Sequence, residues 1–582
     1  MRKLVASLAS LLVCWVGPAS AQFAPTEQPP APEIATGMNP KPLVRSKSWM
    51  AATANPLASE AAAEMLRAGG SAVDAAIAAQ LVLGLVEPQS SGLGGGAFLV
   101  HWSASEKAVS TLDGRETAPA AATPTLFQNE AGEPLSFLDA VVGGRSVGTP
   151  GTPRLIEAGH RRYGKLNWRR LFEPAIRLAE AGFEVSPRLA AQIAEDAPRL
   201  ARNVEAGAYF LPGGAPLKQG ALLKNPKYAE TLKAIRDRGA DAFYSGEIAA
   251  DVVAAVRGAS NPGLLSPGDL ERYSVVERDA VCAPYRALEV CGMGPPSSGG
   301  IAIAQILGML EPTDVAKLGP ESPAAWRLIG DAERLAFADR EAYVADPAFV
   351  PQPTAGLVAR DYLAERAKLL AGDRALTEVP AGKPKFSHAR LFSPDAALEF
   401  AGTSHLSVVD AEGNVVAMTT TIEAGFGSRV MVRGFLLNNE LTDFSFRSHK
   451  DGVPIANRVE PGKRPRSSMA PTIVLKDGRP VLSVGSPGGS QIIGYVAKAL
   501  IAHLDWGLDL AQAAALPNML NRNGAFELEK GTKAEALAEP LKSLGFDVKV
   551  ADMTSGLQAI EIGPDGLSAG VDPRREGLAI GD

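Results

Sequence analysis

Cysteine and histidine are scarce in this chain of 582 residues, which contains three cysteines and six histidines. The histidines are scattered and no His-Glu-x-x-His motif occurs, so we expect neither a metal site nor a cofactor that needs one. Basic and acidic residues are interspersed, with 58 of the former and 64 of the latter, giving a formal charge of −6. Without a basic stripe, nucleic acid is not an expected partner.

The chain has little that could hold it in a membrane. Residues 1–21 combine a basic start, an apolar run too short to span a bilayer comfortably, and an Ala-Ser-Ala ending. This pattern is typical of a signal peptide cleaved before Gln22, which predicts a periplasmic or secreted protein without a membrane anchor. A retained anchor and a lipoprotein attached at Cys14 are the alternatives.

Removal of the signal peptide leaves two cysteines, Cys282 and Cys291. Export permits a disulfide between them, and the eight intervening residues allow a short hairpin that brings them face to face. Unpaired, purely structural cysteines are the alternative, and the sequence does not decide between the two.

The composition changes along the chain and indicates its organisation. Residues 22–47 are rich in proline and polar residues, which predicts an extended tether, with the folded part beginning near Lys47. Helical patterns dominate from about 155 to 375, whereas the last third alternates between β-type segments and glycine-containing turns. We therefore expect an α+β fold, with a layered αββα architecture as its natural form.

A predicted β-hairpin at residues 401–425 brings several polar side chains together. If its turn is centred near Glu412, Thr403 falls opposite Thr421, and Glu423 projects from the same face as Thr421. A slip of one residue would reverse the facing. An exposed hairpin with ordinary threonines is the alternative interpretation.

Two further segments of the last third carry chemistry. Glu440 and Asp443 place two carboxylates just after an apolar strand. A second hairpin, turning between Asp477 and Gly478, would set Ser467 opposite Gly488, where accessible backbone N–H groups suit a developing oxyanion. Capped turns and loops are the structural alternative for each piece.

Taken together, these motifs resemble the gamma-glutamyltranspeptidase family of N-terminal nucleophile hydrolases. The strings TSHLSVVDAEGNVVAM, NNELTDFS, RPRSSMAPTIV and GSPGGSQII resemble its small subunit in order and spacing. Upstream, EPQSSGLGGGAFLV, DGRETAP and PPSSGG resemble its large subunit. The resemblance extends from about residue 48 to the C-terminus.

The resemblance implies a four-layer αββα fold made as one precursor. The chain would cut its own bond between Gly402 and Thr403, giving a large chain (48–402 beyond the tether) and a small catalytic chain (403–582) that stay together as a heterodimer. Thr403 would then carry a hydroxyl nucleophile and a free α-amine, whose unperturbed pKa of roughly 8 lets it serve as the base. Thr421 would support the nucleophile through a hydrogen bond.

The resemblance also implies gamma-glutamyltransferase and glutathione hydrolase activity. Glutathione and other γ-glutamyl compounds would be donors, and water, amino acids or dipeptides would resolve the γ-glutamyl-enzyme. Holding both charged ends of the glutamyl group over Thr403 would select γ-glutamyl bonds. Arg115, Ser467 and Ser468 would bind the α-carboxylate of the substrate. Asp443 would bind its α-ammonium, with Glu440 and Glu423 nearby, and Gly488 and Gly489 would form the oxyanion hole.

The sequence departs from the family pattern at two points. Glu423, Glu440 and Asp443 around one substrate ammonium would be an excess of negative charge. We therefore expect at least one of these acids to be protonated, turned away, or paired with a basic group such as Arg429. The segment between Asp443 and Ser467 lacks the tyrosine that some relatives carry over the site. The balance between hydrolysis and transfer therefore stays open.

Other interpretations of single motifs compete with this one. Ser146 lies in a G-x-S-x-G pattern, but a Pro- and Thr-rich stretch follows where a helix should begin. Residues 92–97 loosely match a dinucleotide fingerprint, yet they follow a predicted helix and not the required strand. His405 could be the base for Thr403, although a core or supporting histidine is the preferred interpretation.

Two whole-protein alternatives remain. One is a cephalosporin or glutaryl acylase on the same fold, whose substrates carry a carboxylate without an ammonium; the presence of Asp443 disfavours it. The other is an inactive secreted binding protein on the scaffold of an enzyme.

Overall fold

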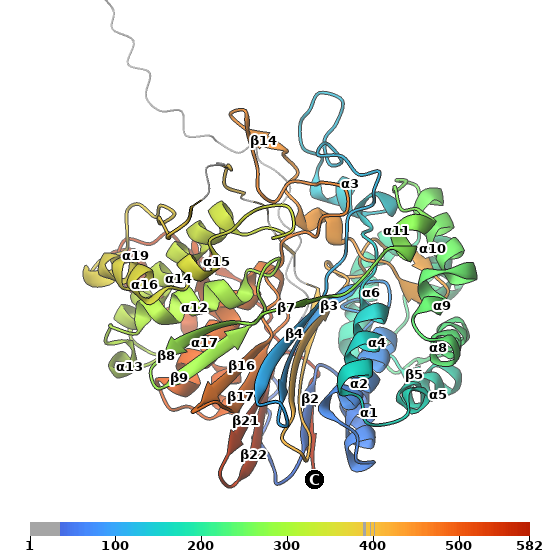
Figure 1. Ribbon diagram of the computed structural model, residues 1–582, viewed down its shortest axis with the longest axis horizontal. Coiled ribbons are helices and arrows are strands. Elements are labelled where there is room, and N and C mark those ends of the chain that lie inside the picture. The colour runs from blue at the N-terminus through green and yellow to red at the C-terminus, as the bar shows by residue number, and fades with distance from the viewer. Residues whose placement is uncertain (1–34, 388–391, 396, 398, 401) are drawn as a thin grey trace, which may run out of the picture.

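The computed structural model describes residues 35–387, 392–395, 397, 399, 400 and 402–582 of one continuous chain, in which a peptide bond still joins Gly402 to Thr403. The predicted signal peptide and the first part of the predicted tether lie outside the described residues. Two seven-stranded antiparallel sheets form the centre of this part of the chain (Figure 1). Helices cover the outer face of each sheet, which confirms the predicted αββα layering.

The first sheet carries the predicted nucleophile and contains strands from both predicted chains. In spatial order, its strands are β23 (Leu578–Gly581), β2 (Met50–Thr53), β10 (Thr403–Val409), β11 (Val415–Thr421), β3 (Gly96–Ser103), β4 (Ala108–Gly114) and β7 (Val276–Arg278). Backbone ladders join β10 to β2 and β11 to β3. Cutting the chain before Thr403 would therefore leave the two products hydrogen-bonded within one sheet.

The second sheet faces the first across the central core. In spatial order, it contains β1 (Val44–Ser46), β22 (Gly566–Val571), β21 (Gln558–Gly563), β17 (Arg479–Gly485), β16 (Thr472–Lys476), β9 (Leu288–Gly292) and β8 (Val281–Tyr285). Cys282 and Cys291 are directly opposite on β8 and β9 and form a disulfide. With Glu289 they make a group of three potential metal ligands among the described residues, but the two sulfur atoms are already joined.

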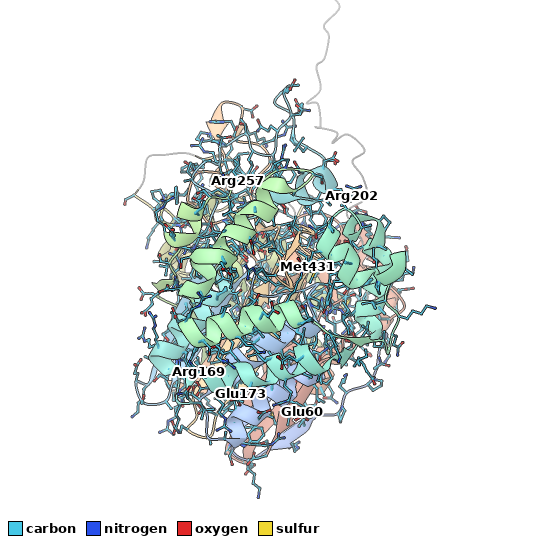
Figure 2. The ribbon with its side chains drawn as sticks, turned by 90° about the vertical axis from the view of Figure 1, so that its right-hand side faces the viewer. Glu60, Arg169, Glu173, Arg202, Arg257 and Met431 are labelled. Atoms are coloured by element: carbon cyan, nitrogen blue, oxygen red, sulfur yellow. A yellow bond between two sulfur atoms is a disulfide. The ribbon has the colours of Figure 1, made fainter. Side chains whose placement is uncertain are left out.

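Helices of the predicted large chain cover the first sheet (Figures 1 and 2). The layer includes α1 (Pro56–Arg67), α2 (Ala72–Val86), α4 (Thr152–Tyr163), α5 (Glu173–Ala181), α6 (Pro187–Leu200), α7 (Val204–Phe210), α8 (Pro226–Arg238), α9 (Asp241–Tyr244), α10 (Gly246–Gly258) and α11 (Pro267–Glu271). Ser71 and Asp74 form a capping box on α2, and every residue of α2 is buried, as its apolar composition requires.

The second sheet is covered by helices from both predicted chains. They are α12 (Gly299–Leu310), α13 (Val315–Leu318), α14 (Pro323–Tyr343), α15 (Thr354–Leu357), α16 (Arg360–Ala367), α17 (Ile492–Leu504), α18 (Leu510–Ala515) and α19 (Ala538–Ser543). A short sheet of β18 (Met519–Asn521), β19 (Phe526–Glu529) and β20 (Val548–Ala551) lies beside α14, and α3 (Phe137–Val141) lies apart from both layers. No helix in the described part of the chain is both long and apolar enough to cross a membrane.

Three two-stranded sheets are described outside the main sheets. The strand β5 (Phe183–Glu184) pairs with β6 (Leu222–Leu223), whereas β12 (Met431–Val432) with β13 (Phe435–Leu436) and β14 (His449–Lys450) with β15 (Val453–Pro454) form short hairpins. Met431 lies at the centre of the helical face in Figure 2, buried among helices of the large chain. The two predicted chains therefore interlock in the helical layer as well as in the first sheet.

The core divides at the first sheet according to the two-residue period of its strands. On β11, Val416 and Met418 pack toward α1 and α2, whereas Val415 and Ala417 pack toward the second sheet. Both faces of β11 are therefore apolar over most of its length. Such burial fixes the register of the hairpin that ends at Thr403 and Thr421.

The packed chain begins earlier than the predicted start near Lys47. The backbone N–H of Thr36 donates to the carbonyl of Arg574 at 2.9 Å, and β1 pairs with β22. The side chain of Asp582, the last residue, accepts hydrogen bonds from Ser48 and neighbouring backbone groups. The proline-rich composition thus marks an extended segment that docks on the C-terminal strands, and not a free tether, from residue 36 onward.

Candidate active site

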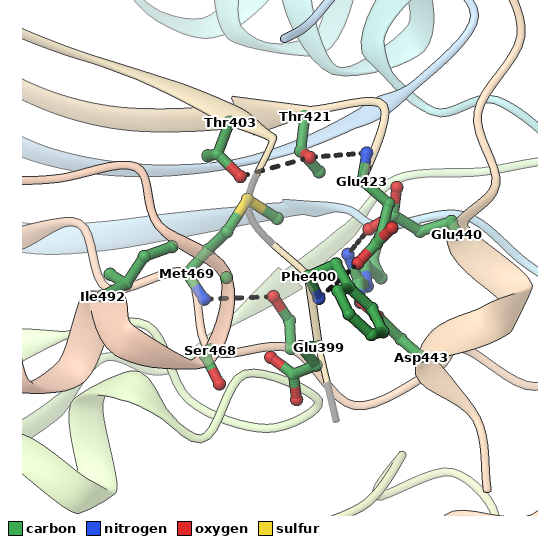
Figure 3. Close-up of a pocket in the computed structure, with 13 residues that line it drawn as sticks. Glu399, Phe400, Thr403, Thr421, Glu423, Glu440, Asp443, Ser468, Met469 and Ile492 are labelled. Atoms are coloured by element: carbon green, nitrogen blue, oxygen red, sulfur yellow. Dashed lines mark hydrogen bonds and ion pairs between the residues drawn. The ribbon is translucent and has the colours of Figure 1, made fainter. Parts of the chain in front are cut away.

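Thr403 and Thr421 are directly opposite each other on β10 and β11, which confirms the register predicted from the turn. The Thr403 hydroxyl donates to Thr421 Oγ1 at 3.3 Å (Figure 3). Thr421 Oγ1 in turn donates to the carbonyl oxygen of Gly402 at 2.6 Å. Arg575 Nη1 donates to the carbonyl of Thr403 at 3.3 Å. The Thr421 hydroxyl therefore connects the expected nucleophile to the bond expected to be cut.

The backbone approaches itself closely at the expected cleavage site. A Cβ atom added at Gly402 would lie 2.1 Å from the carbonyl oxygen of Glu423, so only glycine fits without displacement. Glu423 has a positive φ of 78°, and its backbone N–H donates to Thr421 Oγ1 at 2.7 Å. The carboxylate of Glu423 accepts from Phe400 N at 2.9 Å and from Asn439 Nδ2 at 2.6 Å.

Arg115 occupies the centre of a buried cluster of acids. It follows β4, where Asp113 accepts a hydrogen bond from its backbone N–H at 2.8 Å. Its guanidinium donates to Glu440 and Asp443, and Nη2 also donates to the carbonyl of Arg466 at 2.8 Å. Arg115, Glu440 and Asp443 thus meet in one place, and the Arg115 guanidinium is paired with both carboxylates.

The electrostatics of this cluster favour protonated acids. Burial raises the pKa of Glu423 to about 8, with the charge of Glu440 as the next cause. Burial also raises the pKa of Glu440 and, well above its usual range, that of Asp443. Glu116, which the sequence interpretation missed although it follows Arg115, has its pKa raised well above the usual range by burial and by Glu440.

Of the three outcomes expected for an excess acid, protonation is supported, and pairing with Arg429 does not occur. Arg429 Nε donates to Asp196 at 2.8 Å, and its loop geometry is set by a positive φ of 62°. Arg115 is the basic group that faces Glu440 and Asp443. Excess negative charge is relieved by the raised pKa values of the buried acids and not by a second arginine from the loop.

Ser467 and Ser468 line the cavity, but the backbone pairing of Ser467 differs from the predicted one. A bulge between Val474 and Leu475 shifts the second hairpin by one residue, and Ser467 bridges in parallel to Ser297 instead of pairing with Gly488. The backbone N–H of Ser298 donates to the carbonyl of Ser467 at 2.7 Å. The PPSSGG motif therefore supports the serine pair from the large chain.

The two glycines after β17 both have left-handed backbones, with φ of 137° at Gly488 and 56° at Gly489. Gly489 lines the cavity beside Thr403, and a Cβ there would lie 2.5 Å from the carbonyl of Phe400. A Cβ on Gly488 would instead meet the ring of Tyr495 at 2.7 Å. Both positions need glycine: a side chain at Gly489 would collide with the Phe400 carbonyl, and one at Gly488 would collide with the Tyr495 ring of α17.

These side chains enclose a cavity of only about 10 Å³, which is room for about one water molecule. Glu399 and Phe400, just before the expected cleavage site, are among the side chains that line it (Figure 3). The lining consists of Arg115, Glu399, Phe400, Thr403, Thr421, Glu423, Glu440, Asp443, Ser467, Ser468, Met469, Gly489 and Ile492. The continuous chain therefore blocks its own site.

Two supporting arginines were missed from the sequence. Arg340 of α14 donates to Ser468 Oγ at 3.0 Å and to Ser298 Oγ at 2.9 Å. Arg466 is fully buried next to Ser467. Arg466 lies within the quoted RPRSSM motif, whereas no local pattern marks Arg340, whose contact with Ser468 spans 128 residues.

The competing motifs have structural roles. Ser146 donates to the carbonyl of Val141 at 2.7 Å within a 3₁₀ turn, so it is not a nucleophile elbow. Residues 92–97 follow α2 and lead into β3, which is the reverse of a dinucleotide fingerprint. His405 is buried against Thr419 and Ser407, and burial lowers its pKa to about 3, so it packs as a neutral core residue.

Comparison with known proteins agrees with this geometry. The family model described as gamma-glutamyltranspeptidase matches residues 58–582. The "Glutathione hydrolase proenzyme" of Bacillus subtilis is 38% identical, covering 92% of each chain, and the "Acylase ACY 1 proenzyme" of a Pseudomonas species is 36% identical over 93% of this chain and 94% of its own. The crystal structure of a cephalosporin acylase from Bacillus halodurans superposes with a TM-score of 0.83 at 26% identity, covering 95% of this chain and 99% of that one. The fold, the motifs and these matches establish that the chain belongs to the gamma-glutamyltranspeptidase family.

Proposed function

We propose that this protein is an exported precursor that cuts itself before Thr403 and then transfers the γ-glutamyl group of glutathione and related amides to water or to an amine. The observation that carries the proposal is the position of the Thr421 hydroxyl, which bonds to both Thr403 Oγ1 and the carbonyl of Gly402. The glutathione hydrolase relative supports the choice of donor. No cofactor is needed for this chemistry.

Self-cleavage would begin at the carbonyl that Thr421 already contacts. The Thr403 hydroxyl oxygen attacks the carbonyl carbon of Gly402, its proton passes to the departing backbone nitrogen, and the C–N bond breaks to leave an ester. Water then hydrolyses the ester to a carboxyl on Gly402 and restores the threonine hydroxyl. The hydrogen bond of 2.6 Å from Thr421 stabilises negative charge as it develops on the carbonyl oxygen.

The same threonine would then act on substrate. The new α-amine of Thr403 has an unperturbed pKa of roughly 8, so a fraction is neutral and accepts the hydroxyl proton. Attack on the δ-carbonyl of a γ-glutamyl amide forms an ester to Thr403 and releases the amine, which leaves with that proton. Gly488 and Gly489 would donate backbone N–H groups to the oxyanion.

Recognition of the glutamyl group would proceed by exchange of ion pairs. Arg115 is paired with Glu440 and Asp443 in the uncut chain. A γ-glutamyl group brings an α-ammonium for the acids and an α-carboxylate for Arg115, Ser467 and Ser468, so no buried charge loses its partner. We rank Asp443 first for the ammonium, with Glu440 and Glu423 beside it.

Substrate can enter only after the segment ending at Gly402 moves, because the cavity has room for about one water molecule. Cutting the bond to Thr403 frees that segment at one end. The cleaved chains would remain a heterodimer, since β10 and β11 stay hydrogen-bonded to β2 and β3 of the large chain. We place the mature enzyme in the periplasm or outside the cell.

An acylase activity is the second candidate, favoured by the acylase relatives in sequence and structure. Glutaryl side chains have a carboxylate but no ammonium. Four buried acids, Glu116, Glu423, Glu440 and Asp443, would have no cation to bind in such a substrate. Their presence supports the γ-glutamyl donor.

A single experiment tests the proposed function. Purified protein is assayed with glutathione by following glutamate and cysteinylglycine, and with γ-glutamyl and glutaryl 4-nitroanilides in parallel. We expect two chains on a denaturing gel and a preference for the γ-glutamyl donor. A preference for the glutaryl compound would assign the acylase activity, and an inert single chain would assign a binding protein.

A further inference from the structure

A second cluster of buried charges lies next to the serine pair. Arg340 Nη2 donates both to Ser468 Oγ, at 3.0 Å, and to the carboxylate of Glu399. Arg466 Nη2 lies 3.0 Å from Asp395 Oδ2, and Arg466 Nε lies 3.9 Å from Glu399 Oε1. Two guanidinium groups and two carboxylates thus meet beside Ser468, at the part of the cavity that Glu399 lines.

Both carboxylates belong to the segment that would end at Gly402 after cleavage. Asp395 and Glu399 precede the expected cut after Gly402, whereas Arg340 is anchored in α14 and Arg466 next to Ser467. Both arginines are at least 97% buried, with exposed fractions of 3% and 0%. Withdrawal of the segment would leave two buried cations without their main partners, which is strongly unfavourable.

Arg466 is poorly satisfied even before cleavage. None of its three guanidinium nitrogens makes a hydrogen bond of acceptable geometry within the described residues, although Asp395 is 3.0 Å away. Burial and the charge of Arg466 lower the pKa of Arg340 from its usual value, as expected for two cations held together. The pair is therefore a receptor with more donors than the two carboxylates use.

We propose that Arg340 and Arg466 form an anion subsite that the Glu399 carboxylate fills in the precursor and a carboxylate of the substrate fills in the mature enzyme. This inference rests on the proposed function for the identity of the substrate. The γ-glutamyl α-carboxylate is the ligand that the position fits, because Ser468 contacts Arg340 and lines the same cavity as Thr403 and Arg115. Arg340 and Arg466 thereby join Arg115 in selecting a carboxylate at this end.

The main test compares two inhibitors that differ only in the α-carboxylate. L-Glutamate and its α-amide are measured as competitive inhibitors of γ-glutamyl-4-nitroanilide hydrolysis by the mature enzyme. We expect Arg466→Gln to reduce the preference for glutamate over the amide by about tenfold or more, the cost of one charged hydrogen bond. Arg466→Lys should retain most of the preference.

Controls separate this role from a structural one. Arg458→Gln removes a nearby cation that contacts Glu460 and His449 outside the cavity, and it should leave the inhibitor ratio unchanged. If Arg466→Gln weakens both inhibitors equally, Arg466 only shapes the site and the proposal is wrong. Glu399→Gln in cleaved enzyme should not change the ratio, because its side chain has left the subsite; a changed ratio would contradict the exchange.

A second arm uses the uncut chain and needs no catalysis. In a Thr403→Ala background, Glu399→Gln should lower Tm by about 3 °C or more, because two buried cations lose a partner. The matched exposed change Glu539→Gln, which affects only an ion pair with Lys542, should leave Tm unchanged. An unchanged Tm for Glu399→Gln would overturn the precursor half of the proposal. Failure of wild-type enzyme to cleave any γ-glutamyl donor would instead refute the proposed function, and this arm would still decide the anion subsite.

Discussion

The two charged clusters beside Thr403 differ in how their ions are balanced. At one side, Glu440 and Asp443 pair with Arg115, which is fixed at the end of β4. At the other, Arg340 and Arg466 face Asp395 and Glu399, which precede the expected cut. The acid cluster would therefore keep its counterion after cleavage, whereas the basic cluster would lose Asp395 and Glu399 and keep only the Glu341 carboxylate of α14 nearby.

This difference implies that the precursor carries a substitute for only one half of its substrate. A glutamyl group has an ammonium and a carboxylate, and Glu399 supplies the carboxylate alone. Cleavage would thus leave Arg340 and Arg466 without the Glu399 carboxylate and open space for the substrate in the same step. Substitutions in each cluster would test this difference.

The largest effect is expected from Thr403→Ala, which keeps the basic cluster filled. Without the hydroxyl, the bond after Gly402 stays intact and Glu399 and Phe400 continue to block the cavity. Turnover should fall by roughly 10⁴-fold or more, and binding of L-glutamate should be undetectable by calorimetry. Thr403→Ser is the matched control and should still give two chains. An uncut Thr403→Ala protein that binds glutamate would contradict the blocked site.

Asp443→Asn breaks the acid cluster and leaves the basic one intact. Loss of a buried charge partner for the ammonium should lower kcat/KM for γ-glutamyl-4-nitroanilide by about 10²-fold. For the glutaryl compound, kcat/KM should stay within about threefold, because no ammonium is present. Asp196→Asn, which breaks the ion pair with Arg429 away from the cavity, is the control. Equal losses with both donors would remove Asp443 from ammonium binding.

Gly402→Ala delays the step that separates the two clusters. The added Cβ would lie 2.1 Å from the Glu423 carbonyl, so the scissile carbonyl must move away from Thr421. We expect cleavage, followed on a denaturing gel, to slow by about tenfold or more. Gly372→Ala, in open space in the same chain, should cleave at the normal rate. Normal cleavage of Gly402→Ala would show that this close approach is unimportant.

The smallest effect concerns the protons of the acid cluster. Burial raises the pKa of Glu423 to about 8 in the uncut chain, so between about pH 4.3 and 8 the folded state holds a proton that the unfolded state releases. The stability from this proton is complete below pH 4.3 and is lost as pH rises to 8, by about 1 kcal/mol per pH unit.

Glu423→Gln in the Thr403→Ala background should therefore weaken the fall of Tm between pH 5.5 and 7.5. Glutamine keeps the side chain neutral at every pH and retains an amide oxygen for Phe400 N. Glu412→Gln, at the exposed hairpin turn, should leave the pH dependence as it was. An identical slope in both variants would mean that Glu423 is ionised throughout this range.

The sequence predicted the parts of the site that depend on local strand pairing. Thr403 and Thr421 face each other because a tight turn and two buried strand faces allow one register. The same counting failed for Ser467, because a bulge at Val474 and Leu475 interrupts the second hairpin and has no sequence mark. The layered fold followed from the change of period along the chain.

Contacts between distant segments were not predictable in this way. Arg340 reaches Ser468 from a helix 128 residues earlier, and Arg115 meets Glu440 across 325 residues. Neither distance leaves a periodic pattern, so the family motifs located Arg115 and nothing located Arg340. The segment before the cut carries Glu399 in a stretch without clear secondary structure, where pattern reasoning has least to use.

N-terminal sequencing of the smaller chain from fully active enzyme tests the central claim most directly. We predict that it begins Thr-Ser-His-Leu-Ser, with Thr403 as its first residue, in a chain that ends at residue 582. Full γ-glutamyl turnover by protein in which Gly402 and Thr403 remain joined would contradict the account.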